Sequence, residues 1–149
     1  MCHPMHTEES ILQSRDIKPT AMRILVLRTM AEMGSAVSLS DLEARLSTAD
    51  KSTLFRTLTL FLAHHLVHCI DDGSGFTKYA LCSSDCHCGE ADDDGFSDHH
   101  THFFCERCHR TFCLRGLPVP EVAVPMGFQL HSANYVLKGL CPSCSHCCR

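Results

Sequence analysis

The sequence predicts an α+β fold with a helical N-terminal part that ends in a β-hairpin and a small C-terminal sheet built around metal. Three observations support this prediction. Between residues 20 and 64, apolar residues recur at helical spacing behind capping residues. Two short apolar strands follow, separated by a turn rich in Asp and Gly. The remaining residues carry two Cys-x-x-Cys pairs among short apolar stretches.

The composition excludes several classes of protein. The chain has 149 residues, 44% of them hydrophobic, so global disorder is not expected. No stretch approaches the ~18 apolar residues that span a bilayer, and no signal-peptide pattern is visible. We therefore expect a cytoplasmic protein with no membrane partner, whose 12 cysteines are metal ligands rather than disulfides. The net charge of −4 argues mildly against a nucleic-acid partner, because phosphate contacts favour a basic surface.

Capping residues predict the first two helices. Residues 1–10 have no periodic pattern and are expected to form a loose tail. Thr20 can cap a helix that extends to residue 33, where Gly34 can end it. The residues from Ser40 to Glu43 match a capping box, which predicts a short helix that ends near residue 46.

The third helix is predicted to have one buried and one outward face. Asp50 can cap it, and it extends to about residue 64. Strands at 66–70 and 77–81 follow, so three helices and a hairpin predict a winged helix-turn-helix over residues 1–82. The apolar face of the third helix, expected to be buried, consists of Leu54, Leu58, Phe61 and Leu62.

The rest of the chain divides into a linker and a second domain. Residues 83–98 are polar and acidic, which is typical of a solvated loop. In the domain 99–149, short apolar stretches predict strands. They lie at 103–104, 111–114, 128–130 and 135–137, and prolines bracket a short helix within 118–125.

Four cysteines give the strongest ligand signal. Each Cys-x-x-Cys pair places two sulfurs on one tight turn, and two such turns form a tetrahedral site suited to structural Zn²⁺. The alternative is two unrelated or redox pairs. Cys147 and Cys148 could also supply sulfur to the second turn. The four candidate ligands are Cys105, Cys108, Cys141 and Cys144.

Taken in order, these pieces resemble the ferric uptake regulator (Fur) family of metal-responsive bacterial transcription factors. The resemblance covers residues 15–145 and rests on 18–25 (KPTAMRIL), 51–58 (KSTLFRTL), 100–108 (HTHFFCERC) and 127–144. It implies a winged-helix DNA reader, a small C-terminal α/β dimerisation domain with a structural zinc, and a regulatory metal site near the hinge. It also favours Cys141 and Cys144 as ligands, because both lie within the matched motif.

Within this family, the chain is most similar to the zinc-sensing members. A cysteine follows the second wing strand and a histidine stands at the start of the wing, whereas Ala and Val occupy positions 36, 37 and 80, where iron-sensing members place ligands. A thiolate with imidazoles suits Zn²⁺ better than Fe²⁺ or Mn²⁺. Two of the histidines are i and i+2 on an extended segment, so they are expected on one side. The implied regulatory ligands are His68, Cys82, His100 and His102.

Other possible ligands carry less weight. A third metal site would use His99, Glu121 and His131, for which ordinary surface residues are the alternative. Cys113 stands where relatives carry a glutamate ligand, and is either an extra ligand or a buried thiol. Cys86 and Cys88 lie in the linker and have no assigned role.

The outward face of the third helix is the expected DNA-reading surface. The Arg56 guanidinium suits a guanine edge or a phosphate, and the Phe55 ring can pack on a thymine methyl group. Hydroxyl groups on the same helix suit phosphate contacts. The alternative is a buried Phe55 and a solvated Arg56. The candidate DNA-binding residues are Lys18, Arg23, Ser52, Thr53, Phe55, Arg56 and Thr59.

The sequence therefore favours a zinc-dependent transcriptional repressor of metal-uptake genes that binds double-stranded operator DNA as a homodimer. An iron- or peroxide-responsive member of the same family is one alternative. A Cys- and His-rich zinc-buffering protein is another, but a buffer does not require amphipathic helices and a wing. An enzyme is the least expected class, because no open zinc position beside a general base is indicated.

Overall fold

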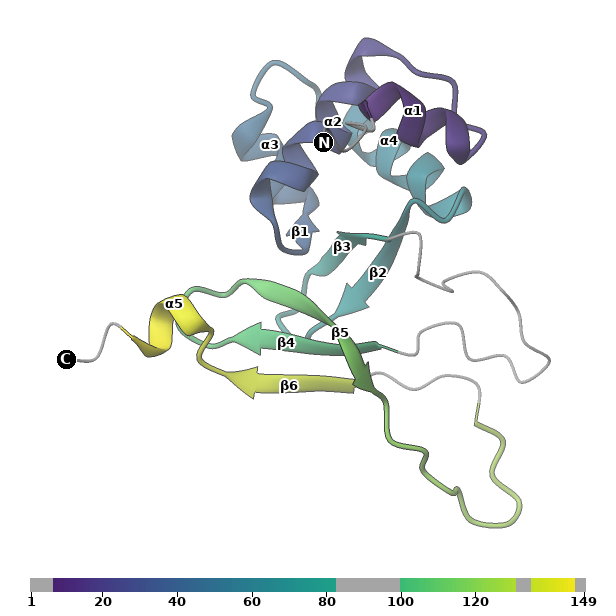
Figure 1. The fold of residues 1–149 in the computed structure, drawn as a ribbon, viewed down its shortest axis with the longest axis vertical. Helices are drawn as coiled ribbons and strands as arrows, with labels where there is room; N and C mark the ends of the chain where they lie inside the picture. Colours follow the sequence, from purple (N-terminus) through teal and green to yellow (C-terminus); the bar gives the residue numbers. More distant parts are fainter. Residues whose placement is uncertain (1–6, 83–99, 131–134, 147–149) are drawn as a thin grey trace, which may run out of the picture.

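The computed structural model describes residues 7–82, 100–130 and 135–146. The helices of the N-terminal residues gather at one end, and a three-stranded sheet built from the C-terminal residues lies beyond the hairpin at the other end, with one short helix beside it (Figure 1). We call residues 7–82 the N-terminal half and the described residues from 100 onward the C-terminal half. Within the described residues, no helix is long and apolar enough to cross a membrane.

The first helix corrects the prediction of a loose tail over residues 1–10. Helix α1 spans Glu8–Ser14, and the side chain of Thr7 caps it by accepting a hydrogen bond from the backbone of Ser10. Leu12 is fully buried in the core, and Glu8 forms a 2.8 Å ion pair with Arg28. The helix is too short to show an apolar period, so packing rather than local pattern determines it. Residues 1–6 lie outside the described part.

Helix α2 (Ala21–Met33) confirms its predicted boundaries. Thr20 caps it by accepting from the backbone N–H of Arg23. Gly34 ends it in the left-handed conformation, with φ of 62°, which glycine adopts without steric cost.

Helix α3 (Leu39–Arg45) begins with a capping box two residues earlier than predicted, so Ser40 and Glu43 do not form it. Ser38 is the cap, and Asp41 accepts from the Ser38 backbone at 2.7 Å. The reason is a short strand, β1 (Val37–Ser38), which pairs with β3 and fixes Ser38 at the point where the strand becomes helix.

Helix α4 (Lys51–Ala63) confirms the predicted cap at Asp50 and most of the buried face. Leu54, Leu58 and Phe61 are fully buried, but Leu62 is 38% exposed, which corrects the prediction for that residue. At 100° per residue, Leu62 lies about 80° around the helix from Leu54, beyond the edge of the buried stripe. Thr57, on the other side of the stripe, is buried instead.

The predicted hairpin is confirmed and forms part of a three-stranded sheet. Strands β2 (Val67–Asp71) and β3 (Thr77–Leu81) are antiparallel, and the sheet order is β1-β3-β2. Together with α2, α3 and α4, this sheet forms the winged helix-turn-helix, and the whole fold is α+β.

The second sheet has the order β5-β4-β6, from strands β4 (His100–Cys105), β5 (Thr111–Pro118) and β6 (Tyr135–Gly139). β4 is antiparallel to β5 and parallel to β6, and the short helix α5 (Pro142–Ser145) follows. The predicted helix within 118–125 and the strand at 128–130 are wrong. β5 extends to Pro118, and the residues 121–130 are exposed, so nothing in the described part of the chain buries their apolar side chains and fixes them in a helix or strand.

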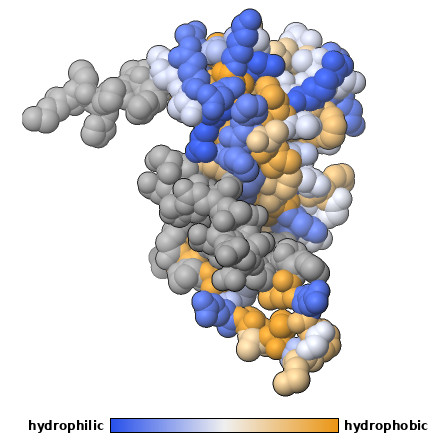
Figure 2. Space-filling view, turned by 90° about the vertical axis from the view of Figure 1, so that its right-hand side faces the viewer, coloured by the Kyte–Doolittle hydropathy of each residue, from blue (hydrophilic) through white to orange (hydrophobic). Residues whose placement is uncertain are grey.

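The apolar cores lie in only one half of the described molecule. Both clusters of buried hydrophobic side chains among the described residues come from the N-terminal half. The C-terminal half instead exposes large apolar side chains, such as Met126 at 101% and Phe128 at 69%. Figure 2 shows hydrophobic residues gathered at the lower end of the molecule, over the connection that follows β5. The sheet of the C-terminal half therefore needs a source of stability other than a hydrophobic core of its own.

Candidate metal centres and nucleic-acid interface

The four predicted structural ligands come together in one cluster. One sulfur atom from each of Cys105, Cys108, Cys141 and Cys144 lies within 4.8 Å of the others. The Sγ atoms of Cys108 and Cys141 are 3.8 Å apart, which equals the about 3.8 Å edge of a tetrahedron with Zn–S bonds of about 2.3 Å. The donor set and spacing thus fit a tetrahedral Zn²⁺. We call these four residues the four-sulfur cluster.

Local backbone geometry forms this cluster. The turn after β4 is closed by the backbone N–H of His109, which donates to Cys105 O at 2.8 Å. His109 itself adopts the left-handed conformation, with φ of 59°. At the second turn, the N–H of Cys141 donates to the Cys105 sulfur at 3.3 Å, and Arg107 donates to the Cys144 carbonyl at 3.1 Å. These bonds hold two segments of the chain that are far apart in sequence.

The thiols of the cluster differ in acidity. Backbone N–H groups, first that of Cys108, lower the pKa of Cys105 to about 6, although burial opposes the shift. Hydrogen bonding to Cys141, together with burial, raises the pKa of Cys144 to about 12. The Cys105 thiol therefore ionises readily, whereas the neighbouring sulfurs oppose ionisation of Cys144. A divalent cation bound among the four sulfurs would offset this repulsion and stabilise all of them as thiolates.

A second group of ligand atoms joins the two halves. Ligand atoms of His68 on β2, His102 on β4 and Cys113 on β5 lie within 4.8 Å of one another. The two imidazole rings are tilted at 38°, with centroids 5.7 Å apart. His68 is 7% exposed and His102 is 1% exposed. Two buried imidazoles at this distance are typical of a metal site or a hydrogen-bonded pair.

Cys82 adjoins this group at the end of the hairpin. Its Sγ lies 3.3 Å from Nδ1 of His68, and its backbone N–H donates to Leu66 O at 2.9 Å. We call His68, Cys82, His102 and Cys113 the interface cluster. These nitrogen and sulfur donors fit Zn²⁺ in chemistry, and each half contributes two of them.

Three of the four predicted regulatory ligands thus lie in the interface cluster, and the fourth, His100, stays a prediction. His100 is the first residue of β4, and the strand pairing shifts register between His100 and Thr101. The extra residues of this shift, 115–117, lie on β5, and β4 itself is continuous from His100 to Cys105. The side chain of His100 lies outside the described part.

Sequence reasoning gave Cys113 a lower rank than the structure does. The signal that could have found it is the antiparallel pairing of β4 with β5, in which Cys113 is directly opposite His102. For the third predicted site, Glu121 is exposed and belongs to neither metal-ligand group of the described residues. His99, His131, Cys86, Cys88, Cys147 and Cys148 lie outside the described part.

The opposite end of the hairpin carries a buried ion pair, Lys78–Asp72, whose two side chains form hydrogen bonds with the C-terminal half. Lys78 Nζ lies 2.7 Å from Asp72 Oδ2 and donates to the His109 carbonyl at 2.9 Å and to the Thr111 hydroxyl at 3.0 Å. Burial raises the pKa of Asp72, but hydrogen bonds from Lys78, Ser74 and Thr111 outweigh it and hold the pKa well below its usual range. The hairpin therefore contacts the second sheet at both of its ends.

The predicted DNA-reading face of α4 is solvent-exposed. Phe55 is 51% exposed, and Ser52, Arg56 and Thr59 also face solvent. The alternative of a buried Phe55 is therefore wrong. A large exposed aromatic residue beside an arginine is what a base-contacting surface requires.

A groove of about 360 Å³ separates the start of α2 from α4. Arg23 and Arg56 line it, together with Thr20, Thr53 and Thr57. Arg23 also donates to the Lys18 carbonyl at 2.7 Å, which holds its guanidinium beside the groove. Two arginines at one groove suit the phosphate backbone of a duplex.

Two of the predicted hydroxyl contacts have partners within α4. The Thr53 hydroxyl donates to Asp50 at 2.6 Å, and the Thr59 hydroxyl donates to the Phe55 carbonyl at 2.9 Å. Each hydroxyl has a single hydrogen to donate. These two threonines therefore support the helix, and the arginines are the stronger candidates for phosphate contacts.

Comparison with known proteins places this geometry in context. The chain is similar to the zinc uptake regulation protein of Escherichia coli (strain K12), with 28% identity over 148 residues that cover 91% of this chain and 78% of that protein. It is also similar to the structure of a zinc uptake regulator complexed with zinc and DNA, with 25% identity, a TM-score of 0.58, and coverage of 93% of this chain and 90% of the other. No protein-family model matches the chain.

The same fold occurs in the ferric uptake regulator of Vibrio cholerae, which shares 17% identity and a TM-score of 0.57 over 89% of this chain and 98% of that one. These relatives are regulators rather than enzymes. Their fold, the four-sulfur cluster and the winged helix agree with the motifs found in the sequence. The chain is thus similar in sequence to zinc uptake regulators and shares its fold with a ferric uptake regulator.

Proposed function

We propose that this protein is a zinc-responsive repressor that binds operator DNA of metal-uptake genes as a homodimer in the cytoplasm. One observation carries the proposal: the interface cluster takes two candidate ligands from the winged helix and two from the second sheet. A site divided in this way makes the position of the DNA-reading half depend on whether its ligands are held together.

The ligands of the interface cluster come from two different parts of the chain. In the interface cluster, His68 and Cys82 belong to the hairpin of the winged helix, and His102 belongs to the second sheet. Zn²⁺, when bound, supplies a tetrahedral centre for such ligands. Holding these ligands together favours one arrangement of the two halves, and binding to an operator that needs the same arrangement is tightened by about 1–3 kcal/mol.

The winged helix supplies the DNA-reading surface in this proposal. Arg56 and Phe55 on α4 read base edges, and Arg23 contacts the phosphate backbone from the groove beside it. The similar zinc uptake regulator whose structure contains zinc and DNA supports this assignment. The net charge of −4 does not oppose it, because the two arginines are concentrated at one groove.

The C-terminal half supplies the dimer contact. Its sheet and the following connection expose apolar side chains that a second copy can bury, including Leu117, Val122, Phe128, Tyr135 and Leu137. Exposed apolar surface of this extent is typical of protein–protein interfaces. A dimer also presents two reading helices, as two operator half-sites require. Residues 1–82 are thus the DNA-binding domain, 83–98 the linker and 99–149 the dimerisation domain.

The test is DNA binding as a function of free zinc. Duplexes enriched from a random library on the zinc-loaded protein serve as the probe, in chelator-buffered zinc under reducing conditions. We expect binding to appear as zinc fills the second site of each chain and to respond weakly to Fe²⁺ and Mn²⁺. Binding that is indifferent to zinc, or equally responsive to iron, contradicts the proposal.

A further inference from the structure

We propose that Cys113 is a ligand of the regulatory centre, so that this centre is a two-thiolate, two-imidazole site selective for thiophilic divalent ions. The ligands are His68, Cys82, His102 and Cys113, and His100 is not needed to complete them. This inference rests on the proposed function and specifies the donor set of the same site.

The position of Cys113 follows from strand pairing. Cys113 on β5 is the direct partner of His102 on antiparallel β4. Side chains directly opposite each other share one face of the sheet, with Cβ atoms about 4.5–5.5 Å apart. The ligand atoms of Cys113, His102 and His68 accordingly lie within 4.8 Å of one another. The register of the sheet therefore aims this sulfur at the two histidines.

The two sulfurs approach the histidines from different halves of the molecule. Cys82 follows β3 and lies 3.3 Å from Nδ1 of His68. Cys113 comes from the second sheet, on the strand beside His102. Two thiolates and two imidazoles are a closed tetrahedral donor set for Zn²⁺. They disfavour Mn²⁺ and Fe²⁺, which suit oxygen-rich sites better.

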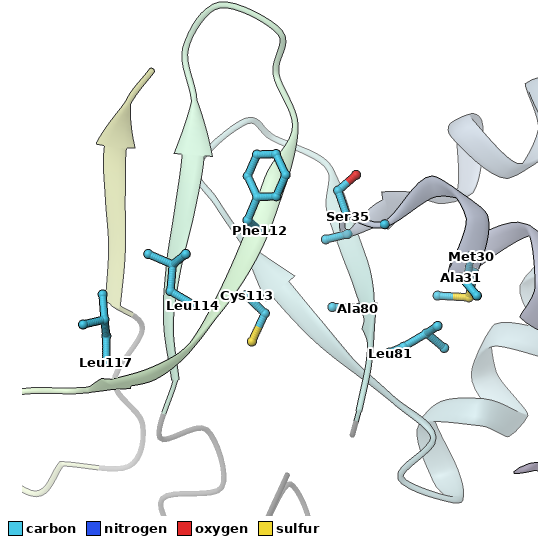
Figure 3. A pocket seen from close by; sticks show the side chains of 11 residues that line it. Met30, Ala31, Ser35, Ala80, Leu81, Phe112, Cys113, Leu114 and Leu117 are labelled. Carbon is cyan, nitrogen blue, oxygen red and sulfur yellow. The ribbon is translucent and has the colours of Figure 1, made fainter. Parts of the chain in front are cut away.

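The surroundings of Cys113 also suit a thiolate ligand. Cys113 lines a cavity of about 590 Å³ between the end of α2, β3 and β5. Figure 3 shows the Cys113 sulfur on the side of β5 away from the Phe112 ring, with Ala80 and Leu81 of β3 across the pocket. The pocket is open on one side, so it offers an incoming ion a path to the Cys113 sulfur.

Cobalt substitution tests the donor set directly. The full-length protein, with its four-sulfur cluster filled by zinc, receives one further equivalent of Co²⁺ per chain under anaerobic reducing conditions. Sulfur-to-cobalt charge-transfer absorbance then reports the number of cobalt–sulfur bonds. We expect Cys113→Ser and Cys113→Ala to lose about half of the absorbance added by this equivalent, because one of two thiolates is removed.

The matched control is Cys69→Ser. Cys69 is an exposed cysteine on β2, next to His68 but on the opposite face of the strand. This variant should keep the full absorbance. All variants should retain one zinc per chain in the four-sulfur cluster and an unchanged far-ultraviolet circular dichroism spectrum, which separates loss of a ligand from loss of the fold.

Metal affinity gives a second readout. Cys113→Ser should weaken zinc binding at the second site by at least about 10-fold, since changes even beyond the direct ligands cost that much. Cys113→Asp should reduce the preference for Zn²⁺ over Mn²⁺, because a carboxylate is a harder ligand. Unchanged charge-transfer absorbance and zinc affinity in all three variants would overturn the inference.

The same experiments separate this inference from the proposed function. If the wild type binds DNA without regard to zinc but the Cys113 variants lose cobalt–sulfur absorbance, the ligand assignment stands and the regulatory function fails. If the wild type responds to zinc and the variants keep both absorbance and affinity, the function stands and Cys113 is not a ligand.

Discussion

The four-sulfur cluster and the interface cluster contain similar ligands but connect different parts of the chain. All four sulfurs of the first come from residues next to β4 and β6, within the C-terminal half. The second takes His68 and Cys82 from the winged helix and the other two donors from β4 and β5. An ion held within one half stabilises that half, whereas ligands shared between halves can change their relative position.

The surroundings of the two clusters reinforce this difference. The C-terminal half has no buried hydrophobic cluster among its described residues, so the four-sulfur cluster and the pairing of β4 with β5 and β6 hold it together. The interface cluster lies beside the winged helix, which has a hydrophobic core of its own, formed by buried residues between Leu12 and Val67. Loss of the four-sulfur cluster should therefore unfold the C-terminal half, and loss of the interface cluster should change the response of DNA binding to zinc.

The largest expected effect comes from breaking the four-sulfur cluster. Cys141→Ser should unfold the C-terminal half, because structural zinc supplies about 10–16 kcal/mol of apparent binding free energy. The helical signal of residues 7–82 should largely remain, since their core is separate. Zinc content per chain and far-ultraviolet circular dichroism check this. A variant that keeps its zinc and its dimer would show that the two clusters do not differ as described.

The buried ion pair within the hairpin provides the next effect, and it tests whether the hydrogen bonds between this pair and His109 and Thr111 connect the halves without metal. Lys78→Met leaves Asp72 charged and buried, and should lower the free energy of unfolding by about 3–5 kcal/mol. Urea denaturation measures this, and Lys78→Met combined with Asp72→Leu should recover much of the loss. If Lys78→Met alone were as stable as the wild type, the ion pair between Lys78 and Asp72 would not contribute to stability.

Acid should weaken the same connection. The pKa of Asp72 is lower in the folded protein than in the unfolded chain. Its contribution to stability is therefore fully present above about pH 4 and is lost as the pH falls further towards the folded pKa. The difference in stability between the wild type and Asp72→Asn should shrink correspondingly, as denaturation at stepped pH would show. A difference that grows on acidification would have the wrong sign.

Changing the interface cluster should alter regulation without unfolding. Cys82→Ser should raise the free zinc required for half-maximal DNA binding by about 5–150-fold, the range of a coupling of 1–3 kcal/mol. Fluorescence anisotropy with a labelled duplex in buffered zinc measures this, and thermal denaturation of the same samples is the control. Loss of the fold would assign Cys82 a structural role and remove the contrast between the clusters.

For the last variant, Cys147→Ser, we expect no effect, and this result would support the assignment of the four ligands in the four-sulfur cluster. Cys147→Ser should leave zinc content and stability unchanged, because Cys141 and Cys144 already complete the cluster. Metal analysis after dialysis, with Cys144→Ser as the positive control, distinguishes the two sulfurs. Loss of zinc from Cys147→Ser but not from Cys144→Ser would show that Cys147, rather than Cys144, supplies the fourth sulfur.

The sequence predicted the parts of the fold that local chemistry determines. The caps at Thr20, Asp50 and Gly34 fixed the limits of α2 and α4, because each satisfies or ends the backbone hydrogen bonding of its own helix. The cap of α3 was misplaced because it depends on the pairing of β1 with β3, which local spacing does not reveal.

The same distinction applies to the candidate metal ligands. Close spacing within each Cys-x-x-Cys turn indicated the four-sulfur cluster. Cys113 ranked lower, because only the register of β4 against β5 brings it opposite His102. His100 stays a prediction, because its side chain lies outside the described part of the chain.

The absence of a buried apolar cluster in the described C-terminal half has a consequence for how the protein accumulates in a cell. A segment that gains its stability from an ion and from a second copy of itself is stable only when both are abundant. We expect newly synthesised chains to mature slowly at low concentration or in zinc-starved cells, and to be degraded more readily there. The amount of intact regulator would then report on zinc supply before any promoter is bound.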